Sequence, residues 1–289
     1  MDLSYTLNNK IKDDKFNIDE LEHYCLSLLI GEEDFQISII DIRNNQCLLI
    51  EDFSYSSQLE SLDIIRLIYK EHHLLEAGFW NNIKIAFKSQ KFTVVPSTIF
   101  NSNQGQKYLS KAVKFDESKE EVLFYKHIKA DCTTIFSVDK GLVKFFNDVY
   151  KNLSLHFLHE SSIFIEGVLR HEDHTDLKSM FISFGSSYFQ VVVTEKKKLL
   201  YYNRFITSNP EQVLKYIMVI INQLGLNQES SKVLAWGNID SGSEKFSILY
   251  KYIRNISFGH KPEYIKSGYV FDSVQDHNYF SILSIYPCD

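Results

Sequence analysis

Apolar residues alternate with other residues in two stretches of the chain that are similar to each other. The first, LIGEEDFQISIIDIRNNQCLLIEDF, covers residues 29–53, and the second, SFGSSYFQVVVTEKKKLLYYNRF, covers residues 183–205. Two short polar segments interrupt each alternating pattern, which is typical of three antiparallel strands joined by turns. The pattern therefore predicts a three-stranded antiparallel meander in each half of the chain.

The two stretches align at a constant offset. Gly31 aligns with Gly185 and Phe35 aligns with Phe189, and the offset is 154 residues in both pairs. The first copy has two extra residues in its second turn. Because glycine supplies the positive φ that tight turns require, Gly31 and Gly185 are expected to be hairpin turn residues with positive φ.

A helix is predicted after each meander. Residues 56–75 and residues 208–224 both carry apolar side chains at helical spacing. In the second segment, Ser208 or Asn209 is suited to cap the helix, and Pro210 is suited to its first turn. The two halves therefore continue to match beyond their meanders.

A short strand is predicted after each helix, over residues 83–89 and residues 232–238. The pair Ala86-Phe87 in the first strand is matched with the pair Ala235-Trp236 in the second. Four elements recur once in the same order, which indicates an internal duplication.

The order of elements limits the folds that are available. A meander, a helix and a strand parallel to the first have few arrangements once the crossover is right-handed, and the ribonuclease H-like module is the best fit. The predicted fold class is α/β, with two tandem ribonuclease H-like modules as in actin-like ATPases, each a mixed sheet with a three-stranded antiparallel meander plus helices. We expect a polar N-terminal segment over residues 1–19, a first half over 20–172 and a second half over 173–289. Residues 132–171, with a strand–helix–strand–helix pattern, would finish the first half and cross into the second.

Two short segments add a family resemblance to this topology. With the order of elements, VPSTIF at residues 95–100 and HNYFSIL at residues 277–283 resemble an uncharacterised Bacteroidetes family, domain of unknown function 3822. The resemblance spans roughly residues 20–289 and implies the actin-like ATPase and ribonuclease H-like fold. It implies no activity, because function depends on the site and not on the fold.

The residues that handle phosphate in actin-like ATPases are incomplete in this chain. Those proteins carry an Asp-x-Gly pattern in each phosphate hairpin, whereas Leu29 and Ser183 stand two residues before the glycines here. The chain has 11 glycines and contains neither GG nor GxG. The residues of a vestigial nucleotide site would be Gly31, Ser183, Gly185 and Gly237, and no catalytic residue is expected.

Nuclease and metal chemistry find little support in the sequence. A ribonuclease H-like nuclease needs several carboxylates that converge on two metal ions, but the strand segments CLSLLI, MFISF and VLAW contain none. The neighbouring acids Glu32, Glu33 and Asp34 lie in a predicted turn, where solvated charges are expected. No metal site is predicted.

The composition argues against some classes of partner and indicates a cellular compartment. The formal net charge of −6 argues against a general nucleic-acid binder, which needs a basic surface. No segment approaches the roughly 18 apolar residues of a membrane span. The four cysteines show no CxxC spacing, which favours free thiols in a reducing compartment: Cys25, Cys47, Cys132 and Cys288. We therefore expect a cytoplasmic protein without nucleic-acid or membrane partners.

The expected function is that of a non-catalytic binding or scaffold protein with a degenerate nucleotide site. The alternative is an enzyme of the same fold that binds or hydrolyses ATP through divergent loops. No cofactor is expected, and ATP would be the cofactor of the alternative. A protein partner or a second copy of the chain is expected to bind the hairpin over residues 189–205. Its tip would present a basic projection on an acidic protein, formed by Lys196, Lys197 and Lys198. A plain solvated turn remains the alternative for these lysines.

Overall fold

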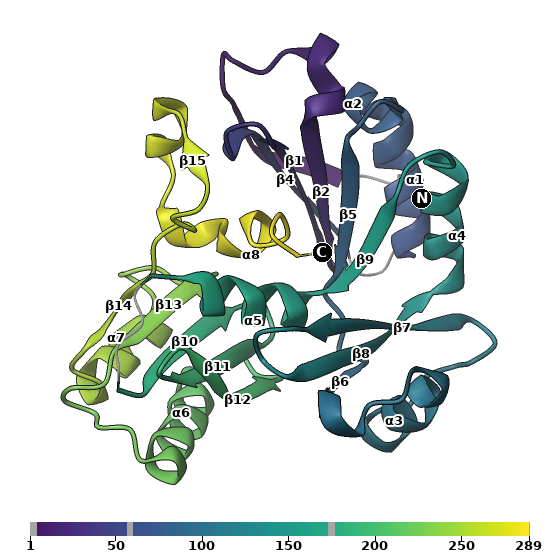
Figure 1. Ribbon diagram of the computed structural model, residues 1–289. Helices are drawn as coiled ribbons and strands as arrows, with labels where there is room; N and C mark the ends of the chain where they lie inside the picture. The colour runs from purple at the N-terminus through teal and green to yellow at the C-terminus, as the bar shows by residue number, and fades with distance from the viewer. Residues whose placement is uncertain (1–4, 57–59, 173–176, 289) are drawn as a thin grey trace. The chain divides into compact units, whose positions relative to one another are not determined.

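The computed structural model describes residues 5–56, 60–172 and 177–288, and it divides into two compact units (Figure 1). Unit 1 consists of Met1–Ile163, Tyr264–Ser273 and Ile285–Asp289, and unit 2 consists of Phe164–Glu263 and Val274–Ser284. The division therefore falls earlier than the predicted boundary at residue 172. It also assigns two short C-terminal segments to unit 1, which the predicted halves did not anticipate.

Unit 1 contains two sheets and four α-helices among its described residues. Its strands are β1 (Tyr5–Lys12), β2 (Tyr24–Ile30), β3 (Asp34–Asp41), β4 (Gln46–Tyr55), β5 (Asn82–Phe87), β6 (Phe92–Pro96), β7 (Glu120–His127), β8 (Cys132–Asp139), β9 (Leu155–His159) and β15 (Lys266–Ser267). Its α-helices are α1 (Ser61–Glu71), α2 (His73–Glu76), α3 (Gly105–Ala112) and α4 (Lys140–Val149), with short 3₁₀ helices η1 (Ile18–His23), η2 (Ser97–Ile99), η3 (Ser102–Gln104) and η4 (Tyr269–Ser273).

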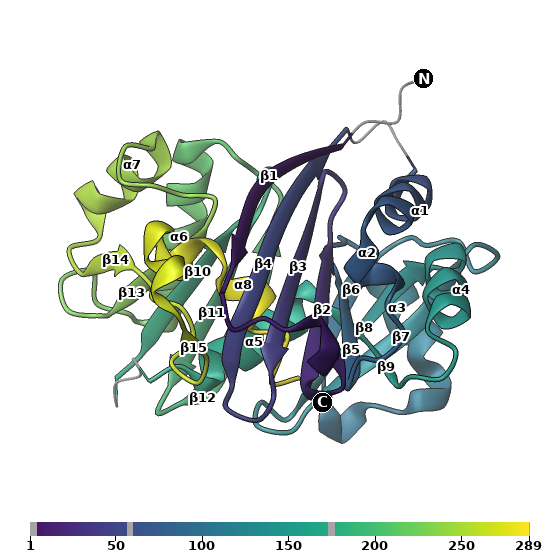
Figure 2. The same cartoon turned by 90° about the horizontal axis from the view of Figure 1, so that it is seen from above.

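The larger sheet of unit 1 is mixed and has the order β1-β4-β3-β2-β5-β9, with β15 beside β4. Figure 2 shows β1, β4, β3 and β2 side by side. These four strands are antiparallel, whereas β5 and β9 run parallel to β2. Helices α1 and α4 pack on one face, where Ile65 and Phe146 join the strand side chains in one apolar core. The smaller sheet, β6-β8-β7, packs against α3.

The N-terminal segment is part of this sheet, which differs from the prediction of a separate polar segment over residues 1–19. Residues 5–12 form β1, the edge strand, which pairs antiparallel with β4. Only Ile11 of this strand is buried. Because an edge strand can leave most of its side chains in water, its polar sequence did not identify it as a strand.

Unit 2 is built on one five-stranded sheet. Its strands are β10 (Ser179–Phe184), β11 (Phe189–Glu195), β12 (Lys198–Phe205), β13 (Val233–Gly237) and β14 (Ile256–Phe258). Its helices are α6 (Pro210–Leu224), α7 (Glu244–Tyr252), α8 (Phe280–Leu283) and the 3₁₀ helix η5 (Asp276–Asn278), and α5 (Glu160–Arg170) contains the division between the units. The order is β12-β11-β10-β13-β14, antiparallel up to β10 and parallel beyond it (Figure 1).

Several predicted elements are confirmed. Asn209 caps α6 by accepting a hydrogen bond from the backbone N–H of Gln212, and Pro210 is the first helical residue. Residues 132–170 form β8, α4, β9 and α5 in the predicted order. The second turn of the meander spans residues 42–45 in unit 1 and residues 196–197 in unit 2, which accounts for the two extra residues of the first copy.

Both units share the order of meander, helix and parallel strand, and Gly31 and Gly185 begin the corresponding turns. The expectation of a positive φ at these two glycines is wrong, because among the described glycines only Gly225 and Gly237 have one. The predicted alignment of the parallel strands, Ala86-Phe87 with Ala235-Trp236, is wrong by one residue. Ile30 pairs with Phe87, and the corresponding Phe184 pairs with Gly237. Ala86 therefore corresponds to Trp236 and not to Ala235, because strand register follows backbone pairing and burial rather than residue identity.

Candidate functional site

The first turn of unit 1 uses both backbone groups of its glycine internally. The N–H of Gly31 donates to the carbonyl oxygen of Asp34 at 2.8 Å. The carbonyl of Gly31 accepts a hydrogen bond from the hydroxyl of Tyr55 at 2.6 Å, and burial raises the pKa of that hydroxyl. A phosphate at this turn would find no free N–H at Gly31.

The space that the missing side chain of Gly31 leaves open is also filled. A Cβ atom at this position would lie 2.0 Å from Oδ1 of Asp34. Glycine at a phosphate loop allows the backbone to approach the ligand closely. Here the space is taken by a carboxylate of the protein itself, and its negative charge repels a phosphate.

Asp34 is paired with Lys88, which follows the last residue of β5. Only 16% of the Lys88 side chain is exposed. Burial lowers the pKa of Lys88, but the charges of Asp34 and Glu160 outweigh burial, so the pKa is raised and the ammonium stays charged. Nearby, burial raises the pKa of Asp52, which accepts a long hydrogen bond of 3.4 Å from Gln36.

This polar cluster lies at the carboxyl ends of β2 and β5, two parallel neighbours in the sheet. In open α/β sheets, ligands bind outside the carboxyl ends of the strands. Lys88 already neutralises Asp34 at this edge. Over residues 5–56, 60–172 and 177–288, no group of three or more His, Cys, Asp or Glu side chains could hold a metal ion. The cluster therefore lies where ligands bind in such sheets, but Asp34 and Lys88 already pair with each other.

The corresponding turn of unit 2 is filled by an aromatic ring. The N–H of Gly185 donates to the carbonyl oxygen of Tyr188 at 2.9 Å. A Cβ atom at Gly185 would lie 2.4 Å from the ring of Tyr188. The guanidinium of Arg204 lies 3.6 Å from the centroid of the same ring, as in a cation–π contact. Both glycine turns thus carry a side chain where a phosphate would approach.

Two further residues of the predicted nucleotide site serve the sheet of unit 2. Gly237 has a φ of +85°, and a Cβ atom there would lie 2.2 Å from the carbonyl oxygen of Phe184. The next residue, Asn238, donates its N–H to that same carbonyl at 2.8 Å. Ser183 is buried in β10 and pairs with Gln190 and Trp236 in the ladder. Glycine at 237 is therefore explained by the close approach of β13 to β10.

The structure thus places Ser183, Gly185 and Gly237 around the end of β10 in unit 2, and Gly31 at the matching turn of unit 1. The three lysines lie at the tip of the β11–β12 hairpin and are exposed. Lys196 and Lys197 both have positive φ angles, of 52° and 62°. They form a two-residue turn of a kind that strongly favours Asn-Gly.

The side chains that fill the two turns are not among the predicted site residues. Asp34 was grouped with Glu32 and Glu33 as a solvated charge, and only those two are exposed. The available signal was Lys88, a cation directly after the buried strand Asn82–Phe87, because a half-buried lysine needs an acidic partner. Tyr188 gave no such signal, since an aromatic residue beside a turn is ordinary.

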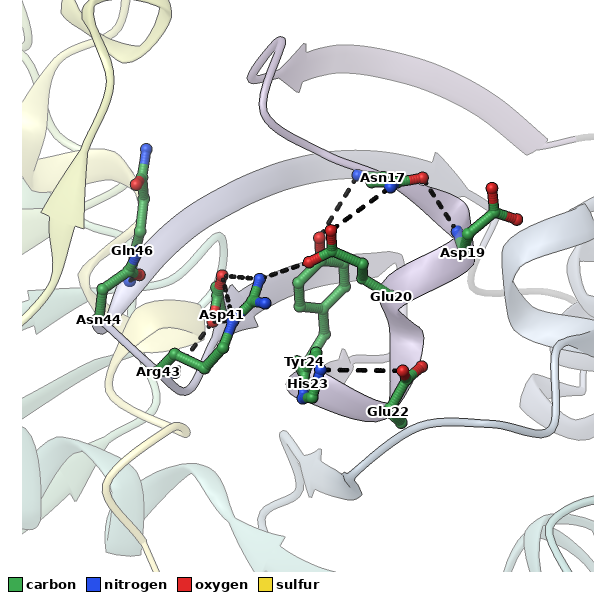
Figure 3. Close-up of polar contacts among 10 residues, drawn as sticks. All are labelled: Asn17, Asp19, Glu20, Glu22, His23, Tyr24, Asp41, Arg43, Asn44 and Gln46. Carbon is green, nitrogen blue, oxygen red and sulfur yellow. Dashed lines mark hydrogen bonds and ion pairs between the residues drawn. The ribbon is translucent and has the colours of Figure 1, made fainter.

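A second polar network lies at the opposite end of β2 (Figure 3). The guanidinium of Arg43 binds Asp41 at 2.7 Å and Glu20 at 2.6 Å. Hydrogen bonds from Arg43 lower the pKa of Asp41. The network joins η1 to the β3–β4 turn, where Asn44 accepts from the N–H of Gln46 at 3.1 Å. Arg43, Asp41 and Glu20 satisfy one another, which indicates a structural role.

The cysteines and the helices bear on the remaining expectations. All four cysteines are free and buried: Cys25, Cys47, Cys132 and Cys288. In the parts of the chain that the structure describes, no helix is both long and apolar enough to cross a membrane.

Comparisons with known proteins agree with the fold. The model of a family described as "Protein of unknown function (DUF3822)" matches residues 13–256. A solved protein of Bacteroides thetaiotaomicron VPI-5482, with an actin-like ATPase fold and unknown function, is 19% identical with a TM-score of 0.80, over 95% of this chain and 99% of that chain. A chain of the PilM–PilN type IV pilus biogenesis complex is 13% identical with a TM-score of 0.57, over 90% of this chain and 97% of that chain. No curated protein matches. The predicted actin-like ATPase fold is confirmed.

Proposed function

The chain belongs to the DUF3822 family of proteins of unknown function, and we propose that it is a non-catalytic binding or scaffold protein with a degenerate nucleotide site. The observation that carries this proposal is the position of the Asp34 carboxylate, which fills the open side of Gly31 and is paired with Lys88. A nucleotide phosphate would have to displace a negative charge that the protein holds in place.

The energetics of this ion pair oppose phosphate binding. Phosphate loops work because several backbone N–H groups point at the anion and no side chain intervenes. At Gly31 the N–H is already donated to Asp34, and the carbonyl is held by Tyr55. A phosphate at this turn would compete with the Asp34 carboxylate for Lys88, so it would gain only the difference between the two ion pairs.

Hydrolysis has an additional requirement that the positions two residues before the turn glycines do not meet. An attacking water and a metal ion need a free carboxylate close to the phosphates. The positions two residues before the turn glycines hold Leu29 and Ser183, both buried. In unit 2, Tyr188 and Arg204 form a stacked pair at the turn instead. Neither of these two positions supplies the acid that actin-like ATPases carry there for ATP hydrolysis.

Thermal unfolding with and without Mg-ATP tests the proposal. A ligand at 100 times its dissociation constant adds about 2.7 kcal/mol to the free energy of unfolding. We expect no change in Tm at 5 mM Mg-ATP and no ATP turnover above the buffer background. The result that would overturn the proposal is turnover that Lys88→Met abolishes while Lys70→Met, at an exposed position, leaves it intact.

A binding role has support from a protein of the same fold. The PilM–PilN complex is by its description an assembly for type IV pilus biogenesis, so this fold can serve in a protein complex. For the present chain we place the contact at the β11–β12 hairpin, with Lys196, Lys197 and Lys198 at its tip. The partner is a protein or a second copy of the chain.

A further inference from the structure

Strand β12 ends the sheet of unit 2 on one side. Within the residues that the structure describes, β12 pairs with β11 and with no other strand. It is eight residues long, whereas β14 at the other end of the sheet has three. A free strand edge presents a row of N–H and C=O groups that another chain can pair with. This edge is therefore a template for strand addition.

Most of β12 lacks the devices that usually protect an edge. Such devices are prolines, bulges and edge lysines. The register shift lies between Val193 and Thr194, opposite the start of β12, and the edge lysine is Lys198 at the turn. From Tyr201 to Phe205 the pairing with β11 is regular, and this stretch contains neither proline nor lysine. Its one charged side chain, Arg204, lies over the ring of Tyr188. These five residues can accept a further strand.

Exposed apolar side chains lie next to this stretch. The ring of Tyr216, on α6, stacks on Phe205 with 4.7 Å between the centroids. Tyr216 is 40% exposed, Val219 is 43% exposed one helical turn further on, and Ile206 directly after β12 is 61% exposed. An added strand would place every second side chain on the face of the sheet that holds Phe205. Apolar side chains at those positions would be covered by Tyr216.

The charge around the edge selects the partner. Basic side chains outnumber acidic ones in the hairpin and the first turns of α6, with Lys196, Lys197, Lys198, Arg204 and Lys215 against Glu195 and Glu211. In the described part of the chain, Lys196, Lys197, Lys198 and Lys215 form no ion pair. The whole chain has a net charge of −6, so this region is positive on an acidic protein. Such a region attracts acidic partners.

We propose that the β12 edge binds an extended acidic segment of a partner protein, which adds to the sheet as a strand and places its alternate apolar side chains against Ile206, Tyr216 and Val219. This inference rests on the proposed binding function and names the class of its partner. A second copy of the chain fits less well, because it would bring the same cluster of positive charges to the same edge.

The test uses the full chain and a fluorescein-labelled dodecapeptide in which Glu or Asp alternates with Val or Phe. We expect saturable binding by fluorescence anisotropy, and weaker binding as NaCl rises from 50 to 500 mM. A peptide with Lys in place of every acid should not bind. Two further peptides carry N-methyl groups on the backbone, one at the odd positions and one at the even positions. Only one of the two should lose binding, because only one set of N–H groups faces β12.

Variants locate the site with matched controls. Ile206→Asp together with Val219→Asp should weaken binding at least tenfold, whereas Ile99→Asp, at an exposed apolar position of unit 1, should not. Changing Lys196, Lys197 and Lys198 to Glu should weaken binding by a similar factor, and the same change at three exposed lysines of unit 1 should not: Lys107, Lys111 and Lys114.

Three results would overturn the inference. The first is the absence of saturable peptide binding, and the second is binding that both sets of variants leave unchanged. The third is preferred association with itself, with single-stranded DNA or with anionic vesicles, measured by light scattering and the same anisotropy assay. ATP turnover would contradict the proposed function but would leave the strand-addition result untouched, so the two failures are distinguishable.

Discussion

Lys84 and Cys288 are joined by a hydrogen bond although 204 residues separate them in the chain. The ammonium of Lys84, at the middle of β5, donates to the carbonyl oxygen of Cys288 at 2.5 Å and to that of Tyr286 at 2.7 Å. Lys84 is 2% exposed. A buried ammonium needs such acceptors, because a charge without partners in the interior is strongly unfavourable. The segment 285–288 is thus an integral part of unit 1.

We predict that Lys84→Met lowers the free energy of unfolding by about 2–4 kcal/mol, because two buried carbonyls lose their donor. Urea unfolding measures this loss, and Lys70→Met on the exposed side of α1 is the matched control, with a change within about 0.5 kcal/mol. Removal of residues 285–289 should lower the free energy of unfolding more in the wild type than in Lys84→Met. Only in the wild type does this removal take the two carbonyl acceptors from a buried ammonium. Equal costs would contradict the assigned hydrogen bonds.

The second prediction concerns acid stability. Burial alone would raise the pKa of Glu51, but His72 and Lys10, at 2.5 and 2.7 Å, hold it below its ordinary value of about 4.3. A carboxyl with a lowered folded pKa contributes stability that is present above the unfolded pKa and is lost as the pH falls through the folded pKa. Glu51→Gln should therefore cost about 2 kcal/mol at pH 6. The difference from wild type should shrink below about pH 4.

Chemical unfolding of both proteins between pH 6 and pH 3 measures this convergence. Glu33→Gln, at an exposed turn position, is the control and should match the wild type throughout. If the difference in the free energy of unfolding between Glu51→Gln and wild type stays constant over this range, the ionisation of Glu51 does not contribute to stability as predicted.

The third prediction concerns the close approach at Gly237. Gly237→Ala should destabilise unit 2 by more than about 2 kcal/mol, because the residue has a φ of +85° and its Cβ would meet the carbonyl oxygen of Phe184. Gly78→Ala is the matched control, since nothing lies within 4 Å of its added Cβ. Thermal unfolding should show a lower Tm for the first variant alone. A neutral Gly237→Ala would show that position 237 tolerates a side chain.

The fourth prediction concerns the tip of the β11–β12 hairpin. Replacing Lys196 and Lys197 by Asn and Gly should raise the free energy of unfolding by about 1 kcal/mol. Both positions have positive φ, which asparagine and glycine adopt more readily than lysine. The same pair of substitutions at Lys107 and Gln106, in α3, should destabilise instead, since glycine is unfavourable in a helix. A loss of stability from the hairpin variant would contradict the turn geometry.

The repeated elements could be predicted from the sequence because their signals are local. Alternation of apolar residues marks the strands of both meanders, and Asn209 with Pro210 marks the start of α6. Polar β1 carries no such signal, because its pairing with β4 is decided by the backbone and not by its side chains. The predicted alignment of Ala86 with Ala235 is wrong by one residue for the same reason, because backbone pairing and not residue identity sets the register.

The candidate site was predictable only in part. The absence of acids at Leu29 and Ser183 can be read from the sequence, and so can the turn glycines. The side chains that fill the turns depend on contacts between distant residues, such as Asp34 with Lys88. The sequence does not encode such pairs as a pattern of spacing, so they require the folded structure.

The discontinuous make-up of unit 1 has a consequence for biosynthesis. A ribosome delivers the N-terminal part of a chain first, and domains generally fold as they emerge. Unit 2 is complete only with Val274–Ser284, and unit 1 is complete only with the segment that follows it, Ile285–Asp289. Until that segment emerges, Lys84 lacks the carbonyls of Tyr286 and Cys288. Both units therefore wait for the C-terminal part of the chain, and unit 1, most of which is translated first, stays incomplete in the nascent chain for longer.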